Sequence, residues 1–204
     1  MVIVINGVNG RMGKMLYDYY KDKFDIIGVD TKVGGFSSFT NIQGINRKID
    51  LVIDFSSTSA LKELEYALEN GIKVISGTTG YEQKELDMLK KLGNGIFYHS
   101  SNYAKGIKIF TKVLKQIRNE YESFDIVETH SSKKKDAPSG TAKMLANELE
   151  FESNKIQSLR LKDSNPIHEV IFTNENEKIK ISHEITNSKA FIEGFDEVLK
   201  QLMM

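Results

Sequence analysis

Short β-branched runs alternate with amphipathic stretches along the first half of the chain. In the stretch 57–70, for example, Leu61, Leu64 and Leu68 fall at helical spacing and would share one face. Alternation of this kind is typical of parallel βαβ units. We therefore expect strands at 2–6, 25–30, 50–55, 72–76 and 95–99, helices at 11–20, 57–70 and 82–92, and a polar loop with room for one short strand at 34–46.

The pattern changes after Asn102. Strands at 159–161, 168–173 and 178–183 alternate apolar and polar positions, as in an antiparallel sheet with one exposed face. The other elements expected here are a strand at 124–130 and helices at 106–121, 139–150 and 190–203. The predicted fold class is α/β, with an N-terminal doubly wound parallel sheet and a second, smaller α+β domain containing an open mixed or antiparallel sheet.

Two domains are expected from this change of pattern. The first comprises residues 1–101 and 188–204, and the second comprises residues 102–187. The last helix is assigned to the first domain because no later element follows that could cover the edge of its sheet.

Composition excludes several classes of protein. Lysine and arginine number 28, and aspartate and glutamate also number 28, so the formal net charge is zero and no strong field attracts nucleic acid or a membrane surface. No apolar run approaches the roughly 20 residues of a membrane-spanning helix. The absence of cysteine excludes disulfides, thiolate catalysis and cysteine-ligated zinc. The first residues lack the features of a signal peptide, so we expect a cytoplasmic protein.

Glycines mark the turn from the first strand into the first helix. The spacing of Gly7, Gly10 and Gly13 permits a tight turn, and the helix N-terminus presents free N–H groups to phosphates. A strand–helix turn without a ligand is the alternative. Asp30 favours the interpretation as a dinucleotide site. In such sites an acidic residue about 20 residues after the glycine turn accepts hydrogen bonds from the ribose of NAD. NADH is therefore favoured as cofactor, although Lys32 could offset the charge of Asp30 and NADPH stays open.

Two more turns follow parallel strands, at 54–57 and at 77–80. Since ligands of such sheets collect at the carboxyl ends of the strands, these turns could hold the ribose and nicotinamide of an extended cofactor. Taken singly, each turn is better explained as an ordinary loop than as a site.

The segment 128–141 carries the candidate substrate chemistry. His130 is a titratable imidazole, and Lys133, Lys134 and Lys135 follow in a polar loop that could also be merely solvated. The run 138–141 then opens a helix whose N–H groups suit a carboxylate. Together these groups match the reduction of a small acidic substrate.

The sequence resembles the dihydrodipicolinate reductase family of the diaminopimelate route to lysine. The resemblance rests on segments that occur in family order along nearly the whole chain. They are Gly7–Gly13, Asp54-Phe55-Ser56, Gly77-Thr78-Thr79-Gly80, Asn102-Tyr103, Glu128-Thr129-His130, Lys134 to Ala142 and His168-Glu169-Val170. The run Asp136-Ala137-Pro138-Ser139-Gly140-Thr141 is the most selective of them.

The resemblance implies a Rossmann-type first domain, a homotetramer and NAD(P)H-dependent reduction of 4-hydroxy-tetrahydrodipicolinate to tetrahydrodipicolinate. Hydride would reach ring carbon C4 of a cyclic imine dicarboxylate, and a proton would follow. His130 and Lys134 correspond to proton donors, and no metal is expected. The implied substrate contacts are Ser131, Ser139, Gly140 and Thr141. The implied cofactor contacts are Gly7, Val8, Asn9, Gly10, Arg11, Met12, Asp30, Phe55, Gly77, Thr78, Thr79, Ser101, Asn102 and Tyr103.

The sequence departs from the family pattern at several positions. Ser131 replaces the second member of a His-His pair, Lys105 places a charge near the expected hinge, and Lys189 stands where a late arginine is usual. These changes keep two alternatives open, a related amino- or keto-acid dehydrogenase and a dinucleotide sensor without catalysis. Retention of His130 and Lys134 argues against the sensor, which would require neither proton donor.

Overall fold

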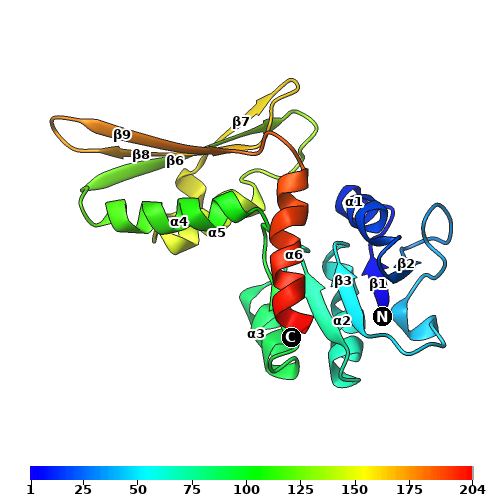
Figure 1. Ribbon diagram of the computed structural model, residues 1–204. Helices are drawn as coiled ribbons and strands as arrows, with labels where there is room; N and C mark the ends of the chain where they lie inside the picture. Colours follow the sequence, from blue (N-terminus) through cyan, green and yellow to red (C-terminus); the bar gives the residue numbers. More distant parts are fainter. Residues whose placement is uncertain (204) are drawn as a thin grey trace. The chain divides into compact units, whose positions relative to one another are not determined.

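The computed structural model describes residues 1–203, which form two compact units. The first contains Met1–Ser101 and the chain from Asp196 onward, and the second contains Asn102–Phe195 (Figure 1). The boundary therefore falls within the last helix, α6 (Lys189–Met203). Residue 204, part of the predicted first domain, lies outside the described residues.

A five-stranded parallel sheet forms the centre of the first unit, in the order β2-β1-β3-β4-β5. Residues in the middle of β1 and β3 are completely buried on both faces, which explains their continuous apolar sequences. The order reverses between β1 and β3, as in doubly wound sheets that bind ligands at such a switch point. The strands are β1 (Val2–Asn6), β2 (Asp25–Val29), β3 (Leu51–Asp54), β4 (Lys73–Ser76) and β5 (Phe97–His99).

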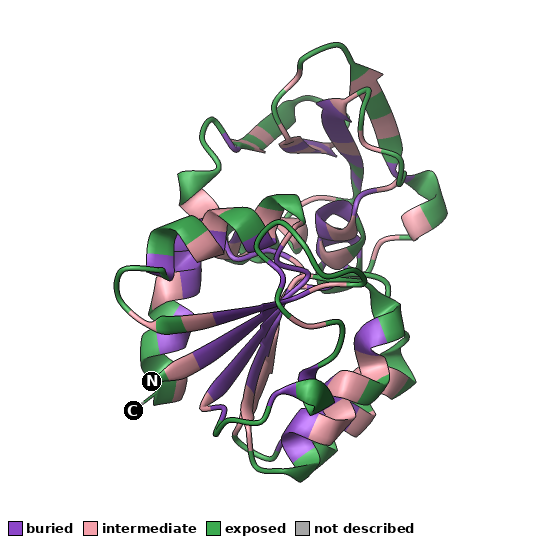
Figure 2. Cartoon of the chain, turned by 90° about the vertical axis from the view of Figure 1, so that its right-hand side faces the viewer, coloured by how far each residue is buried: buried purple, intermediate pink, exposed green. Residues whose placement is uncertain are grey.

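Helices flank this sheet, and each turns its apolar stripe toward it (Figure 2). They are α1 (Arg11–Tyr20), α2 (Leu61–Glu69), α3 (Gln83–Leu92) and the C-terminal part of α6. The Tyr20 hydroxyl donates to Asp196 Oδ1 at 2.7 Å, and Lys73 Nζ donates to the Leu202 carbonyl at 2.6 Å. The end of α6 therefore belongs to the first unit.

The second unit contains a four-stranded mixed sheet in the order β7-β6-β8-β9. Strands β6 and β7 are parallel, and the other pairs are antiparallel. Helices α4 (Lys105–Arg118) and α5 (Gly140–Glu148) cover one face with an apolar core, while Leu159 and Leu161 on the other face stay about half exposed. The strands are β6 (Ser123–Ser131), β7 (Gln157–Leu161), β8 (Ile167–Thr173) and β9 (Lys178–Glu184).

The predicted fold class is confirmed, and the differences concern element ends. The predicted helix 57–70 begins with a 3-10 turn, η2 (Thr58–Ala60), before α2. The loop 34–46 contains another, η1 (Ile42–Gly44), and isolated bridges in place of a short strand. The strand predicted at 159–161 begins earlier, at Gln157, and pairs parallel to β6 because α5 makes the crossover between them.

Among the described residues, none of the helices is both long and apolar enough to cross a membrane.

Candidate active site

The glycine turn adopts the conformation that the sequence predicts for a phosphate-binding loop. Gly7 has φ +79°, and a Cβ there would lie 2.5 Å from the Phe55 carbonyl oxygen. A Cβ on Gly13 would lie only 2.2 Å from the Gly7 oxygen, so α1 packs directly on the turn. Helix α1 has no acidic residue in its first turn and no side-chain cap. Its N-terminal N–H groups therefore fit the pyrophosphate of a dinucleotide.

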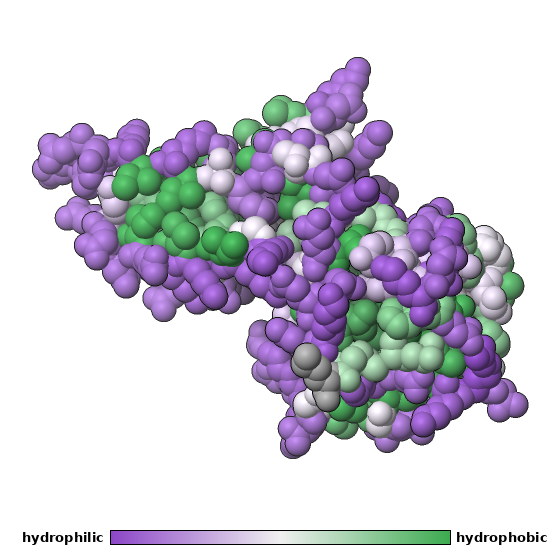
Figure 3. Space-filling view, viewed as in Figure 1, coloured by the Kyte–Doolittle hydropathy of each residue, from purple (hydrophilic) through white to green (hydrophobic). Residues whose placement is uncertain are grey.

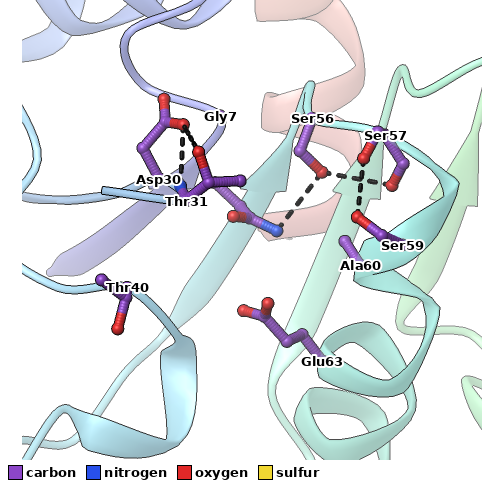
Figure 4. A pocket seen from close by; sticks show the side chains of 10 residues that line it. Gly7, Asp30, Thr31, Thr40, Ser56, Ser57, Ser59, Ala60 and Glu63 are labelled. Atoms are coloured by element: carbon purple, nitrogen blue, oxygen red, sulfur yellow. Dashed lines mark hydrogen bonds between the residues drawn. The ribbon is translucent and has the colours of Figure 1, made fainter. Parts of the chain in front are cut away.

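A polar pocket lies beside this turn, at the switch point of the sheet (Figure 4). The carboxylates of Asp30, which directly follows β2, and of Glu63 on α2 both line it. The described residues that line it include neither lysine nor arginine. They are Asn6, Gly7, Asp30, Thr31, Thr40, Ser56, Ser57, Ser59, Ala60 and Glu63. Acceptor groups without a cation suit ribose hydroxyls better than an additional phosphate.

Asp30 also holds the glycine turn in place. Its Oδ2 accepts from the Asn9 amide at 2.9 Å, and its Oδ1 accepts from the Thr31 amide at 2.8 Å. The Asn9 side chain makes two hydrogen bonds to the loop beyond β2. Its Nδ2 donates to the Gly34 carbonyl and its Oδ1 accepts from the Phe36 amide, both at 3.0 Å. In Asp30, Oδ1 accepts in addition from the Thr31 hydroxyl at 3.4 Å, whereas Oδ2 keeps a second acceptor site, so Asp30 can also accept from a ribose.

At the carboxyl ends of four neighbouring strands, one polar residue from each strand is paired directly with the next. We call this set the strand-end row, and it consists of Asn6, Asp54, Ser76 and His99. Asp54 is completely buried and accepts from Asn6 Nδ2 at 3.3 Å and from the Ser76 hydroxyl at 2.8 Å. Burial raises the pKa of Asp54, and hydrogen bonds from Ser56 and Ser76 oppose the rise. The sequence interpretation did not include Asp54 among the site residues.

The strand-end row fixes the two turns that the sequence predicts as cofactor contacts. The Ser56 hydroxyl donates to Asp54 at 2.5 Å, and the Ser56 amide donates to Thr78 Oγ1 at 2.9 Å. A Cβ on Gly77 would lie 2.1 Å from the Phe55 ring, so the two turns pack against each other. Phe55, Gly77 and Thr78 are thereby brought together, whereas Thr79 is exposed.

The predicted cofactor contacts at 101–103 lie where the first unit ends and the second begins. Asn102 Nδ2 donates to Thr141 Oγ1 at 3.0 Å, and its Oδ1 accepts from the Ala104 amide. Tyr103 is buried, with its ring centroid 5.2 Å from that of Phe195. In the second unit, therefore, Asn102 positions a predicted substrate contact, Thr141.

A buried polar cluster in the second unit surrounds His130. His130 Nδ1 directly contacts Glu128 Oε2, two residues earlier on the same face of β6. Arg160 Nη2, from β7, donates to Glu128 Oε1 at 2.8 Å. The rings of His130 and His168 are 5.4 Å apart at their centroids. Glu128, Arg160 and His168 were not predicted as site residues, although the alternation of a strand places Glu128 beside His130.

The N-terminus of α5 and the lysine loop join this cluster. Ser139 caps α5 by accepting from the Ala142 amide at 3.2 Å, and its hydroxyl lies 3.3 Å from His168 Nε2. Gly140 and Thr141, the next predicted substrate contacts, begin the helix. The lysine loop precedes this helix and joins the cluster at Asp136, whose carbonyl oxygen accepts from Arg160 Nη2 at 2.5 Å.

Only one of the three lysines lies against this structure. Lys134 Nζ donates to Asp136 Oδ1 at 2.7 Å and is half-buried, whereas Lys133 and Lys135 are exposed. Ser131, at the end of β6, accepts from the Lys133 amide at 3.4 Å. Of the three lysines, Lys134 is thus the partly buried one, and the role that the sequence predicts for it stays a prediction.

Burial and charge set the protonation states of the cluster. Burial lowers the pKa of His130, the Glu128 carboxylate opposes this, and Lys134 lowers the pKa further. Burial lowers the pKa of His168 to about 3, so this residue is neutral near pH 7. Burial alone would raise the pKa of Glu128, but the Arg160 hydrogen bond brings it below its usual value.

Glu128, His130 and His168 could together offer three metal-ligand atoms within 4.8 Å of one another. The guanidinium of Arg160 lies against the same carboxylate, and its positive charge opposes a second cation there. We therefore interpret this group as a cluster of charged and hydrogen-bonded side chains.

A dinucleotide-type sheet, followed by a second unit in which titratable side chains lie beside a helix N-terminus, indicates an oxidoreductase. Residues 1–103 match the family profile of the dihydrodipicolinate reductase N-terminus, and residues 106–204 match that of its C-terminus. The chain belongs to the dihydrodipicolinate reductase family. Its activity is that of a 4-hydroxy-tetrahydrodipicolinate reductase in lysine biosynthesis, and the family uses NAD(P)H.

Individual relatives agree with this assignment over almost their whole length. The 4-hydroxy-tetrahydrodipicolinate reductase of Clostridium tetani is 33% identical, covering 94% of this chain and 88% of the relative. That of Caldanaerobacter subterraneus is 30% identical, covering 98% and 92%. A dipicolinate-bound dihydrodipicolinate reductase from Paenisporosarcina sp. TG-14 has the same fold, with a TM-score of 0.78, 20% identity and coverage of 100% and 94%.

Proposed function

We propose that His130 and Lys134 supply the protons for the reduction, and that the first unit holds the nicotinamide cofactor. The cluster around Glu128 carries this proposal, because Glu128 contacts His130 and the Ser139 amide at the start of α5 directly. Arg160 then joins Glu128 to the lysine loop at the Asp136 carbonyl. The test is oxidation of NADH or NADPH in the presence of the aldolase product of pyruvate and aspartate semialdehyde. Oxidation that depends on this product supports the reductase, and oxidation with another amino or keto acid alone supports the related dehydrogenase.

The cofactor contacts in this proposal are those that the sequence predicts. The N–H groups at Arg11 and Met12 bind the pyrophosphate, beside Gly7, Val8, Asn9 and Gly10, whose own amide donates to the Gly7 carbonyl. Asp30 accepts from the ribose, and the turns with Phe55, Gly77, Thr78 and Thr79 contact the remainder, together with Ser101, Asn102 and Tyr103. When bound, the reduced nicotinamide supplies a hydride. The predicted domains, 1–101 with 188–204 and 102–187, remain the proposed cofactor and substrate domains.

The proposed substrate is a small dicarboxylate, like the dipicolinate that the Paenisporosarcina relative is described as binding. The N–H groups at Gly140 and Thr141 and the Ser139 and Ser131 hydroxyls bind its carboxylates. Lys134 adds a positive charge to the same loop. His130 presents Nε2 as the atom that holds or delivers a proton, since Nδ1 contacts Glu128.

The composition of the pocket supports a preference for NADH over NADPH. Asp30→Ala should weaken NADH more than NADPH and move the ratio of their kcat/KM values toward NADPH, because a carboxylate repels a 2′-phosphate. Asp30 also holds the Asn9 amide, so both cofactors should bind more weakly. The ratio is therefore the measurement that tests the role of Asp30. An unchanged ratio would contradict the proposal that Asp30 recognises the cofactor.

A homotetramer is the proposed assembly. The second unit has two separate apolar surfaces, as a tetramer with two kinds of interface requires. Leu159 and Leu161 are exposed on the open face of the sheet, and Ile109, Val113 and Ile179 are exposed over α4 and β9 (Figure 3).

Light scattering at micromolar concentration should therefore give the mass of a tetramer, and Leu161→Asp should reduce it to a smaller species. Leu92 is 40% exposed on α3 in the first unit, so Leu92→Asp is the control and should leave the mass unchanged. A monomeric parent chain would contradict this assembly.

A further inference from the structure

The carboxylate of Glu128 is completely buried at the centre of the proposed substrate site, where a charge requires partners. Its Oε1 accepts from Arg160 Nη2 at 2.8 Å and from the Ser139 amide at 3.4 Å. Its Oε2 directly contacts His130 Nδ1. Neither of these two atoms has a hydrogen-bond partner of regular geometry in the described chain, and the close contact between them is a charge contact. The contact with His130 is thus the interaction that satisfies this side of the carboxylate.

The ionised carboxylate can only accept hydrogen bonds, so it determines which ring nitrogen of His130 carries hydrogen. Nδ1 must be the donor toward Glu128 in both the neutral and the charged ring. Nε2 is then the nitrogen that gains and loses the proton. Arg160 contributes by holding the carboxylate ionised, since its hydrogen bond lowers the pKa of Glu128.

We propose that Glu128 is a positioning residue of the reduction, which fixes the Nδ1–H tautomer of His130 and sustains its affinity for a proton at Nε2. The inference rests on the proposed role of His130 as a proton donor. Glu128 itself need not touch the substrate, because it acts through the imidazole, in the way that a carboxylate behind a histidine fixes its ring orientation and basicity.

The charges around His130 give the direction of the expected pH effect. Lys134 from the loop and Arg160 from β7 lower the pKa of His130, as burial does, and Glu128 on β6 raises it. His168 on β8 is neutral, because burial lowers its pKa to about 3. Removing the charge of Glu128 leaves only influences that lower the pKa of His130. The imidazolium would then exist only at lower pH.

The experiment is ¹⁵N NMR of the full-length protein labelled at histidine, together with pH profiles of kcat. The chain has four histidines, so each signal can be assigned by single substitution. The parent chain should show neutral His130 as the Nδ1–H tautomer. In Glu128→Gln the pKa of His130 should fall, and the loss of kcat at rising pH should begin at lower pH. At pH 7.5, kcat of Glu128→Gln should fall at least about tenfold, the typical loss when a carboxylate that supports a histidine is changed. KM for NADH should stay within about twofold of the parent value.

Glu169→Gln is the matched control. Glu169 follows His168 on β8, and its side chain pairs with Lys180. This variant should keep the His130 tautomer, the pH profile and kcat of the parent chain.

An Nε2–H tautomer of His130 in the parent chain overturns the proposal, and this result does not depend on whether Glu128→Gln folds. An unchanged His130 pKa and an unchanged pH profile in a folded Glu128→Gln also overturn it. A failure of the proposed function would look different. His130→Ala would then retain full turnover, while the NMR tautomer would still report on the Glu128 contact.

Discussion

Lys134→Ala should lower kcat/KM by at least about a hundredfold, the typical loss when a positioned acid or charge clamp is removed. Lys134 is the member of the lysine run that lies against the folded cluster, with Nζ 2.7 Å from Asp136 Oδ1. His130→Ala should cause a loss of similar size. NADH binding should be nearly intact in both variants, because the glycine turn and its pocket lie in the first unit.

The neighbouring lysines are the controls for this result. Lys133 and Lys135 are exposed, so Lys133→Ala and Lys135→Ala should stay within a few-fold of the parent kcat/KM. Steady-state kinetics with both substrates varied, and a separate titration with NADH, measure the effect. Equal losses in all three lysine variants would show that the loop acts as a diffuse positive patch.

Gly13→Ala should have the largest effect on the first unit. The added Cβ would meet the Gly7 oxygen at 2.2 Å and Val8 Cα at 2.7 Å, and both are backbone atoms that cannot rotate away. Helix α1 would have to move off the turn, at a cost of about 3 kcal/mol. The melting temperature should fall by roughly 10 °C, and NADH should bind more than tenfold more weakly, because the helix N-terminus leaves its place.

Gly10→Ala is the control for stability. A Cβ there would be 3.1 Å from the Gly7 oxygen, a distance that a small shift can relieve, so the melting temperature should stay within about 3 °C of the parent value. Thermal unfolding followed by circular dichroism and isothermal titration with NADH measure the two effects. A Gly13→Ala variant that melts with the parent chain would contradict this account of the turn.

The sequence predicts local features of this molecule well. Strands β1 and β3 are recognisable because both of their faces are buried, so their apolar runs are unbroken. The glycine turn is recognisable because phosphate-binding turns require particular backbone geometry. His130 and Lys134 emerge from motif order along the chain.

Features that depend on pairing between distant strands could not be predicted in this way. Arg160 reaches Glu128 across a parallel pair, 32 residues later in the chain, and the sequence suggests an antiparallel sheet there. Asp54 follows an apolar run and looks like a turn residue until strand register aligns it with Asn6 and Ser76. In both cases a buried carboxylate gains its role from tertiary partners.

The strand-end row also determines which loops of the first unit tolerate insertions and deletions. An insertion at the carboxyl ends of β3 or β4 would pull Asp54 or Ser76 away from bonds that depend on their level in the sheet. The turns at Gly71 and Gly95 lead into the opposite ends of β4 and β5, and space is open around both glycines. Evolutionary loss of loop length, or an epitope inserted for a biosensor, is best accommodated at these two turns.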